Sequence, residues 1–442
     1  MAPTLLLIQP SHYLAPDDRR LFKTKRRSVV PLTLPYLAAL TPPGWTVRLI
    51  DEQLDDIDFT APVDLVGLTS WTLQSYRAYD IAAEFRRRGV PVVMGGPHVF
   101  FYAEEARQHV DSVMIGEAEP TWRTMLADAA AGRLRSCYQA APLETLEGLP
   151  LPRYELLDMR RFGPFRTFAM QTSRGCPYQC NFCSERLYLG GKYRWRPPEE
   201  VVAEIHRSGA RSLFFGESNF AGNKARATAL MEALIPLGVR WSTLWALPMC
   251  LDGKFLDLAV RAGVLHVNIG LESISAESIR DMGKTQNRAI TYVHALENLR
   301  RRGITYSLNF IFGWDSESPD AFRATLDFLR ANKVPAAYFN ILTPTRGTEL
   351  FARMKAEGRI PEEAAIDRWP GQFCHFRPLH GTPTQLEAQV QAMYRKFYSF
   401  PSMLHRLPLP PRSKSDLASW VINLGERRMH RAAQANDDFD HY

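Results

Sequence analysis

The sequence of 442 residues lacks several features that would assign it to a simple class. It has no apolar run near the roughly 20 residues that cross a bilayer, and its first residues lack the basic start and cleavage site of a signal peptide. Its six cysteines do not form the regular pattern of a disulfide framework. These absences predict a cytoplasmic protein with no membrane span and no structural disulfides.

The charge distribution argues against a nucleic-acid partner, although the net charge is +7 and the pI about 9.1. Basic residues gather in short runs such as 19–27, 86–88 and 300–302, and acids are interspersed elsewhere. No run interleaves aromatic and basic residues as a base-stacking platform does. The basic runs therefore indicate solvated faces or local anion contacts.

The first block, from Thr4 to about Gly132, alternates apolar runs with helical patterns. Continuous Val, Ile and Leu runs that end in Gly, Ser or Pro are typical of parallel strands buried on both faces. The pattern predicts a doubly wound, Rossmann-like α/β domain over residues 1–145, followed by a proline-bearing linker over 146–167. Ligands of such sheets bind beyond the carboxyl ends of the strands, here the loops TSWT, GGPH and GEAE.

The second block, residues 168–348, repeats a strand and a helix six times. The predicted strands are FAMQTS, SLFFGE, RWSTLW, HVNIGLE, TYSLNFIFG and AYFNILTP. Six parallel strands are fewer than the eight that close a barrel, so the pattern predicts a partial (β/α)6 barrel with its chemistry at the carboxyl ends of the strands.

The third block, residues 349–442, is predicted to be a small, mostly helical region that ends in a polar tail. One helix is expected to begin at Thr384 and to stop near Pro401. Cys374 and His375 lie in this block, and a packed thiol is favoured there over a role in a site.

Three cysteines fall within eight residues in the segment QTSRGCPYQCNFCSE, directly after the first strand of the second block. Their spacing is C-x3-C-x2-C, and no fourth cysteine or nearby histidine completes the set. Structural zinc takes four ligands, and catalytic zinc usually takes three that include histidine. Three thiolates on one loop instead favour an iron-sulfur cluster with one iron open to another ligand, and zinc or incidental cysteines are less favoured.

This loop resembles the signature of the radical S-adenosylmethionine (SAM) superfamily, which has the same spacing and an aromatic residue, here Phe182, before the last cysteine. The resemblance implies a 4Fe-4S cluster on Cys176, Cys180 and Cys183, with SAM on the remaining iron. It also implies that one electron from the cluster cleaves SAM to a 5'-deoxyadenosyl radical. An external one-electron reductant, similar to flavodoxin or ferredoxin, is the implied partner.

Other segments of the predicted barrel resemble the SAM-binding segments of that superfamily. FFGESNF resembles the segment that receives the methionyl amino group, which implies Gly216 and Glu217, although Ser218 departs from the version with two acids. NIGLES resembles the segment near the nucleoside, which implies Glu272 and Ser273. NFIFGW resembles the wall of the adenine pocket, and no catalytic residue is identified.

The first block resembles the cobalamin-binding domain that precedes the barrel in one class of these enzymes, through VVMGGPHVFFYAEEARQHVDSVMIGEAEPTW. The resemblance implies a cobalamin site that includes Thr69, Ser70, Gly95, Gly96, His98, Gly116 and Glu117. The paired glycines permit close approach of the backbone to a bulky group. No Asp-x-His-x-x-Gly motif supplies a cobalt ligand, so His98 is expected near the cofactor but not on cobalt. A scaffold without cofactor is the alternative.

The resemblance implies a cobalamin-dependent radical SAM enzyme that methylates an unactivated carbon of a small biosynthetic intermediate. Within the same architecture the alternatives are cyclisation, rearrangement, oxidation or transfer of another SAM-derived group such as 3-amino-3-carboxypropyl, with or without bound cobalamin. The alternative outside enzymes is a cobalamin or iron-sulfur carrier or sensor. The sequence does not identify the substrate.

Overall fold

The structure is a computed structural model and describes residues 2–15, 18–361 and 371–436. The chain forms two compact units. The first comprises Met1–Gln171 and Arg194–Ser212, and the second comprises Thr172–Tyr193 and Leu213–Tyr442.

The first unit is built around a sheet of six parallel strands in the order β5-β1-β6-β7-β8-β9. The strands of this sheet are β1 (Thr4–Gln9), β5 (Thr46–Asp51), β6 (Leu65–Thr69), β7 (Val92–Gly95), β8 (Ser112–Ile115) and β9 (Cys137–Gln139). Its main helices are α1 (Thr33–Leu40), α2 (Ser75–Arg87), α3 (Pro97–Phe101), α4 (Ala103–Ala106), α5 (Trp122–Ala130) and α7 (Pro198–Ser208). The unit also contains the strands β2 (Tyr13–Ala15), β3 (Asp18–Leu21), β4 (Arg27–Val30), β10 (Phe162–Met170) and β12 (Arg194–Trp195).

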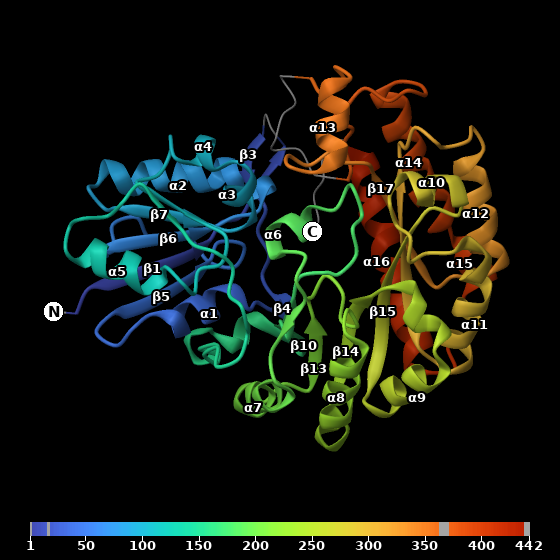
Figure 1. Cartoon of the computed structure of the whole chain (residues 1–442), viewed down its shortest axis with the longest axis horizontal. Helices are drawn as coiled ribbons and strands as arrows, with labels where there is room; N and C mark the ends of the chain where they lie inside the picture. The colour runs from blue at the N-terminus through green and yellow to red at the C-terminus, as the bar shows by residue number, and fades with distance from the viewer. Residues whose placement is uncertain (1, 16–17, 362–370, 437–442) are drawn as a thin grey trace. The chain divides into compact units, whose positions relative to one another are not determined.

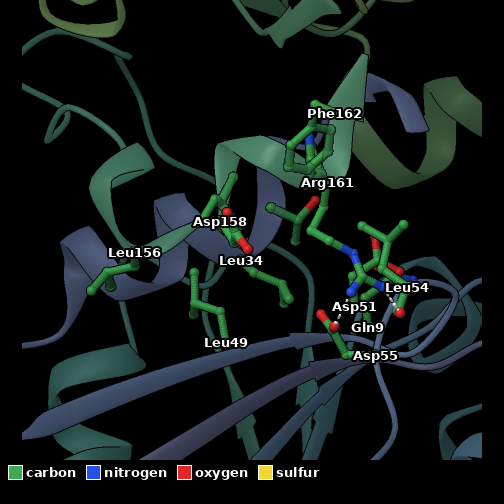
Figure 2. A pocket seen from close by; sticks show the side chains of 13 residues that line it. Gln9, Leu34, Leu49, Asp51, Leu54, Asp55, Leu156, Asp158, Arg161 and Phe162 are labelled. Carbon is green, nitrogen blue, oxygen red and sulfur yellow. Dashed lines mark hydrogen bonds and ion pairs between the residues drawn. The ribbon is translucent and has the colours of Figure 1, made fainter. Parts of the chain in front are cut away.

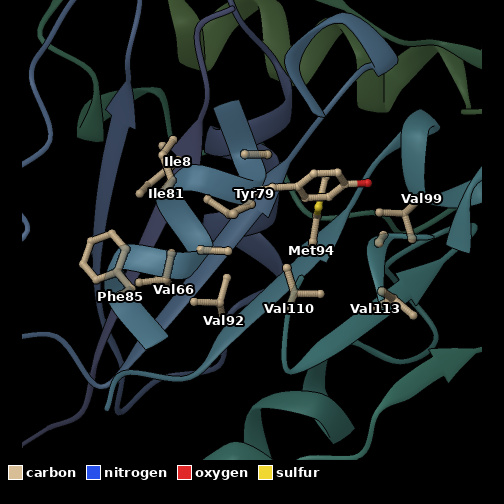
Figure 3. Packing of buried hydrophobic residues seen from close by; sticks show 14 of the residues in the cluster. Ile8, Val66, Tyr79, Ile81, Phe85, Val92, Met94, Val99, Val110 and Val113 are labelled. Carbon is tan, nitrogen blue, oxygen red and sulfur yellow. The ribbon is translucent and has the colours of Figure 1, made fainter. Parts of the chain in front are cut away.

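Both faces of this sheet are covered by helices, which explains why its central strands, such as β6 and β7, are buried and largely apolar (Figure 1). Leu6 and Ile8 of β1 belong to a core with Phe85 of α2. Figure 3 shows Ile8 and Phe85 in this core. Leu5 and Leu7, which point to the opposite face, belong to a core with helices α1 and α5. The prediction of a doubly wound sheet is therefore confirmed.

The second unit contributes strands β11 (Ser173–Arg174), β13 (Ser212–Phe215), β14 (Arg240–Trp245), β15 (Val264–Glu272), β16 (Thr305–Phe312) and β17 (Ala336–Ile341). Its helices are α6 (Ser184–Leu189), α8 (Lys224–Leu234), α9 (Gly253–Arg261), α10 (Ala276–Asp281), α11 (Tyr292–Arg301), α12 (Ala321–Ala331), α13 (Glu349–Ala356), α14 (Pro383–Phe397), α15 (Phe400–Arg406) and α16 (Lys414–Asn436).

The second sheet has seven strands in the order β17-β16-β15-β14-β13-β10-β4, and the pairs with a defined register are parallel. The six predicted strands of the partial barrel are all present in their chain order. The seventh strand, β4, was not predicted. Its four residues, RSVV, directly follow a basic run and are too few to show a period.

The helical third block differs from the prediction in its boundaries. The N-cap of helix α14 is Thr382, two residues before the expected Thr384; its hydroxyl accepts a hydrogen bond from the backbone N–H of Gln385, and Pro383 occupies the first turn. Pro401 does not stop that helix but lies in the first turn of α15. The predicted polar tail continues as helix α16 to Asn436, and residues 437–442 lie outside the described residues.

Candidate cofactor sites

The three clustered cysteines lie on a loop that follows β11 and ends where Cys183 caps α6. Gly175 opens this loop with a φ of +87°, and a Cβ atom there would collide with the carbonyl oxygen of Lys192. The backbone N–H of Cys176 donates to Gly190 at 3.3 Å, and that of Cys183 donates to Cys180 at 3.2 Å. The loop is thereby folded onto itself, with the three thiols half-buried.

The surroundings of the cysteine loop are partly apolar. The ring of Phe182 packs edge-to-face on buried Trp314, with centroids 5.5 Å apart. Burial raises the pKa of the Cys183 thiol to about 11 and raises the pKa of Cys176. Binding of a metal group must therefore release thiol protons here, since thiolates are the ligands.

A cubane cluster fits this donor set better than a single metal ion does. Among the described residues, no three His, Cys, Asp or Glu side chains converge closely enough to hold one ion. A 4Fe-4S cubane takes one thiolate per iron, so its cysteines stand farther apart than the ligands of one ion. Three thiolates on one loop match that requirement, and the zinc interpretation does not.

Glu217 follows β13 and is only 2% exposed. Its Oε1 accepts from the backbone N–H of Thr172 at 3.0 Å and from the Thr172 hydroxyl, and Arg226 lies 3.9 Å away. Its Oε2 is buried and has no hydrogen-bond partner among the described residues. Burial raises the pKa of this carboxyl. The second oxygen is thus an acceptor without a donor, which suits a ligand ammonium group.

Glu272 ends β15 in an unusual backbone conformation, with a φ of +65°. The register between β15 and β16 shifts between Gly270 and Glu272, as in a β-bulge. Its carboxylate pairs with Lys284 at 2.7 Å, and the two side chains are 9% and 11% exposed. Burial lowers the pKa of Lys284, but the attraction of Glu272 and of the Cys180 thiolate outweighs it and the pKa is raised.

The remaining residues predicted near SAM take part in local turns. Gly216 follows β13 directly, beside Glu217. The hydroxyl of Ser273 accepts from the backbone N–H of Ser275 at 3.0 Å. Ser218, the residue that departs from the expected two-acid version of this segment, donates to the carboxylate of Glu185 at 2.8 Å. A carboxylate therefore lies beside this turn, supplied by helix α6.

In the first unit, the predicted cobalamin residues meet at one edge of the sheet. Thr69 and Gly95 end the neighbouring strands β6 and β7 and are register partners. Gly96 has a φ of +100°, and a Cβ there would lie 2.8 Å from the backbone nitrogen and oxygen of Ser70. Glycine at this position therefore lets the turn after β7 pack closely against Ser70.

His98 lies at this edge but is fully buried. Its Nε2 shares a hydrogen bond of 2.7 Å with the Tyr79 hydroxyl, and its ring stacks on Tyr102. Burial lowers the pKa of His98 to about 4, so the ring is neutral at neutral pH. These contacts engage the imidazole inside the unit.

Gly116 and Glu117 follow β8 at the same edge. Gly116 has a φ of +87° with open space beside it. The Glu117 carboxylate pairs with Arg194 at 2.8 Å and accepts from the backbone N–H of Leu143 at 2.7 Å. The side chain of Glu117 therefore holds the connector that follows β9.

A separate cavity of about 50 Å³ lies near the ends of β1 and β5 (Figure 2). Gln9, Asp51 and Leu34 line it, and Arg161 pairs with Asp55 at 3.2 Å on its border. That volume admits a few water molecules and no cofactor. None of the predicted site residues lines it.

Sequence reasoning missed the partners of the two buried glutamates. Thr172 and Arg226 surround Glu217, and Lys284 neutralises Glu272. Gln286 donates to the Cys180 sulfur at 3.7 Å. Arg226 lies on helix α8, and Lys284 and Gln286 lie in a turn, with no period or motif that marks them. Thr172, by contrast, lies just before the cysteines in the segment already singled out.

Comparisons with known families agree with this geometry. The family model of the radical SAM superfamily matches residues 170–329, and that of the B12 binding domain matches residues 25–126. A solved structure of the radical SAM methyltransferase TsrM from Kitasatospora setae, with cobalamin and a [4Fe-4S] cluster bound, has the same fold. Its TM-score is 0.65 at 18% identity, over 97% of this chain and 89% of that one.

Two relatives from Chlorobaculum tepidum match over most of both chains. The bacteriochlorophyllide d C-12(1)-methyltransferase is 30% identical over 90% of this chain and 89% of its own length. The bacteriochlorophyllide d C-8(2)-methyltransferase is 28% identical over 91% of this chain and 92% of its own length.

Together these matches define a radical SAM enzyme with a cobalamin-binding domain. The chain belongs to the family of cobalamin-dependent radical SAM methyltransferases. Its cofactors are a 4Fe-4S cluster, SAM and cobalamin, and the carrier or sensor alternative is not supported. Among the described residues, no helix combines the length and apolarity that crossing a bilayer requires.

Proposed function

We propose that the protein methylates an unactivated carbon of a small biosynthetic intermediate, with the cluster and SAM at the barrel strands and cobalamin at the edge of the first sheet. The single observation that supports this most strongly is the three-thiolate loop, which leaves one cluster iron for SAM. The relatives named above are carbon methyltransferases by name, which supports the same reaction.

We assign Cys176, Cys180 and Cys183 as cluster ligands and Phe182 as the apolar wall beside them. The fold of the loop supports this assignment, because the turn at Gly175 and the hydrogen bond from Cys183 to Cys180 fold the short segment with the three thiols onto itself. The apolar contact between Phe182 and Trp314 limits access of water to that side of the loop.

We assign Gly216 and Glu217 to the methionyl end of SAM, and Glu272 and Ser273 to its nucleoside end. The unpartnered Oε2 of Glu217 supports the first assignment, since a buried acceptor without a donor is costly until a ligand supplies one. The strained backbone at Glu272 supports the second, because such strain persists where a side chain must be aimed.

We assign Thr69, Ser70, Gly95, Gly96 and Gly116 to the cobalamin edge. Gly116 has open space beside it, and Gly96 lets its turn pack against the Ser70 backbone. His98 contributes to this edge by packing and does not ligate cobalt, because its Nε2 already pairs with Tyr79. Glu117 contributes through its backbone.

When bound, the cluster supplies one electron to SAM, and cobalamin carries the methyl group. The chain's own residues bind and orient these groups and exclude water, as Glu217, Phe182 and the glycine edge illustrate. Our proposed domain organisation remains residues 1–145, 146–167, 168–348 and 349–442. We place Cys374 outside the site, because its thiol donates to the carbonyl oxygen of Phe376 at 3.2 Å.

A small-molecule substrate and an external electron donor are general to this superfamily. We further propose a flavodoxin- or ferredoxin-like reductant, a cytoplasmic location and no nucleic-acid partner. Because two relatives that match most of the chain are named for bacteriochlorophyllide d, a chlorin is the first substrate to test.

The test is anaerobic reconstitution with iron, sulfide and hydroxocobalamin, followed by incubation with SAM, a reductant and a chlorin. A methyltransferase forms S-adenosylhomocysteine, 5'-deoxyadenosine and a product heavier by one methyl group. Formation of 5'-deoxyadenosine with an unmethylated, rearranged or cyclised product would contradict methylation. Bound cofactors without any SAM cleavage across a panel of substrates would contradict the enzyme assignment.

A further inference from the structure

Residues 281–287, here called the bridging segment, contact the cysteine loop directly. The backbone N–H of Asn181 donates to Met282 at 3.1 Å, and its side-chain nitrogen donates to Asp281 at 2.6 Å. Gly283 turns the segment with a φ of +66°, and a Cβ there would lie 3.2 Å from the carbonyl oxygen of Gln179. The segment is therefore packed tightly against the loop that carries the three cysteines.

The same segment holds the strained end of β15. The side-chain nitrogen of Asn287 donates to the carbonyl oxygens of Gly270 at 2.9 Å and Leu271 at 3.1 Å. Lys284 pairs with the Glu272 carboxylate at 2.7 Å. Strained backbone persists when surrounding contacts over-determine it, and these contacts do so for Glu272.

One side chain of the bridging segment contacts a cysteine directly. Gln286 donates from its side-chain nitrogen to the Cys180 sulfur at 3.7 Å, while its carboxamide oxygen has no partner among the described residues. Lys284 lies two residues before Gln286, and its ammonium group pairs with the Glu272 carboxylate at 2.7 Å. A hydrogen-bond donor to a ligand sulfur and a largely buried cation thus lie on the same segment.

We propose that Gln286 and Lys284 are positioning residues that raise the reduction potential of the cluster on Cys180 while fixing Glu272 for SAM. This inference rests on the proposed function, in which the three cysteines hold that cluster. Adding one electron makes the cluster more negative, and both a donor to a ligand sulfur and a nearby cation stabilise the added charge. The electron comes from the external one-electron reductant and no covalent bond changes in this step.

The test is a redox titration of the reconstituted full-length protein without SAM, followed by electron paramagnetic resonance. Gln286→Leu removes the donor at similar volume, and we expect the ratio of reduced to oxidised cluster at a fixed potential to fall about three- to tenfold, tenfold being 59 mV for one electron. Gln286→Glu replaces the donor with a negative charge and should lower the ratio further. Gln391→Leu, the same change on an exposed face of α14, should leave it unchanged.

Substitutions of Lys284 provide a second, independent set of variants for the same titration. Lys284→Met should lower the same ratio and also weaken SAM binding severalfold, because Glu272 loses its partner. Lys284→Arg keeps the charge and should restore most of both quantities. Iron content is measured in every variant, and we expect it to equal that of the wild type.

The outcomes separate this inference from the proposed function. If the wild type assembles no 4Fe-4S cluster, the proposed function fails and the inference fails with it. If the wild type is loaded and titrates normally but Gln286→Leu and Lys284→Met share its potential, only the inference is overturned. Loss of iron in both Gln286→Leu and Lys284→Met would also overturn it, because the residues would then serve to fold the loop.

Discussion

The cobalamin edge of the first unit and the cysteine loop region of the second unit are built from different chemistry. At the first, strands end in glycine and small polar residues, and the one histidine is turned inward to Tyr79. At the second, three half-buried thiols lie on one loop, and two buried carboxylates, one of them paired with Lys284, lie at strand ends. One region offers space and backbone, and the other offers ligands and charge.

The two sites should therefore be sensitive to different kinds of substitution. A site made of backbone fails when volume is added, because a Cβ at Gly96 meets Ser70. A site made of ligands and charges fails when a functional group is removed at constant volume. The predictions below test that contrast, in order of decreasing effect.

The largest effect is expected from the cysteine loop. Replacing Cys176, Cys180 or Cys183 by alanine should remove the cluster and all activity, since each thiolate holds a different iron. Iron analysis and visible absorption measure the loss, against about four irons per chain in the reconstituted wild type.

Cys250→Ala and Cys137→Ala are the controls, because these thiols lie outside the loop. Both should retain iron. A colourless wild-type protein loaded with zinc would contradict the cluster assignment.

The next effect is expected at the cobalamin edge. Gly96→Ala should abolish cobalamin binding, because the added methyl group meets the Ser70 backbone at 2.8 Å and the φ of +100° is strained for alanine. The measurement is the cobalamin retained after desalting, read from its absorption spectrum.

Gly89→Ala is the matched control, since Gly89 also has a positive φ, +77°, but open space beside it. It should lose some stability and keep cobalamin. Equal retention in Gly96→Ala would show that this edge does not contact the cofactor.

A smaller effect is expected at Glu217. Glu217→Gln should weaken SAM binding by about one to two powers of ten, because a charge-assisted hydrogen bond contributes roughly 1.5 to 3 kcal/mol. Equilibrium titration with SAM measures this, with iron content determined in parallel.

Glu204→Gln is the control, since Glu204 is equally buried but pairs with Arg196 in the first unit. Glu272→Gln should have a milder effect than Glu217→Gln, because an amide oxygen still accepts from a ribose hydroxyl. Wild-type affinity in Glu217→Gln would refute its assignment to SAM.

The smallest effect on a cofactor is expected at His98. His98→Gln should leave the cobalt absorption spectrum unchanged, because the imidazole pairs with Tyr79 and not with cobalt. A changed spectrum would contradict this assignment.

The same variant should alter the pH dependence of stability. The pKa of His98 is lowered from 6.5 to about 4, so its contribution is complete above pH 6.5 and is lost as the pH falls toward 4, on the order of 3 kcal/mol. Urea unfolding between pH 4.5 and 7 should therefore show a shallower pH slope in His98→Gln. His12 and His266, whose pKa values burial also lowers to about 4, preserve part of the slope.

Several features of this protein were predictable because their signals are local. The apolar runs of Thr4–Gln9 and Leu65–Thr69 predicted buried parallel strands, and the spacing of the three cysteines predicted an iron-sulfur loop. Chemistry carried by a short contiguous segment is readable from order and spacing alone.

Other features were decided only by the tertiary structure. The pairing of Glu272 with Lys284 and of Glu117 with Arg194, and the addition of β4 as a seventh strand, join residues that share no period or motif. The same is true of the start of α14, which is set by the capping hydrogen bond of Thr382 and lies before the predicted Thr384. The sequence by itself determined the class of cofactors and the positions of most strands. Only folding decided which charges neutralise which, because that depends on distances between segments far apart along the chain.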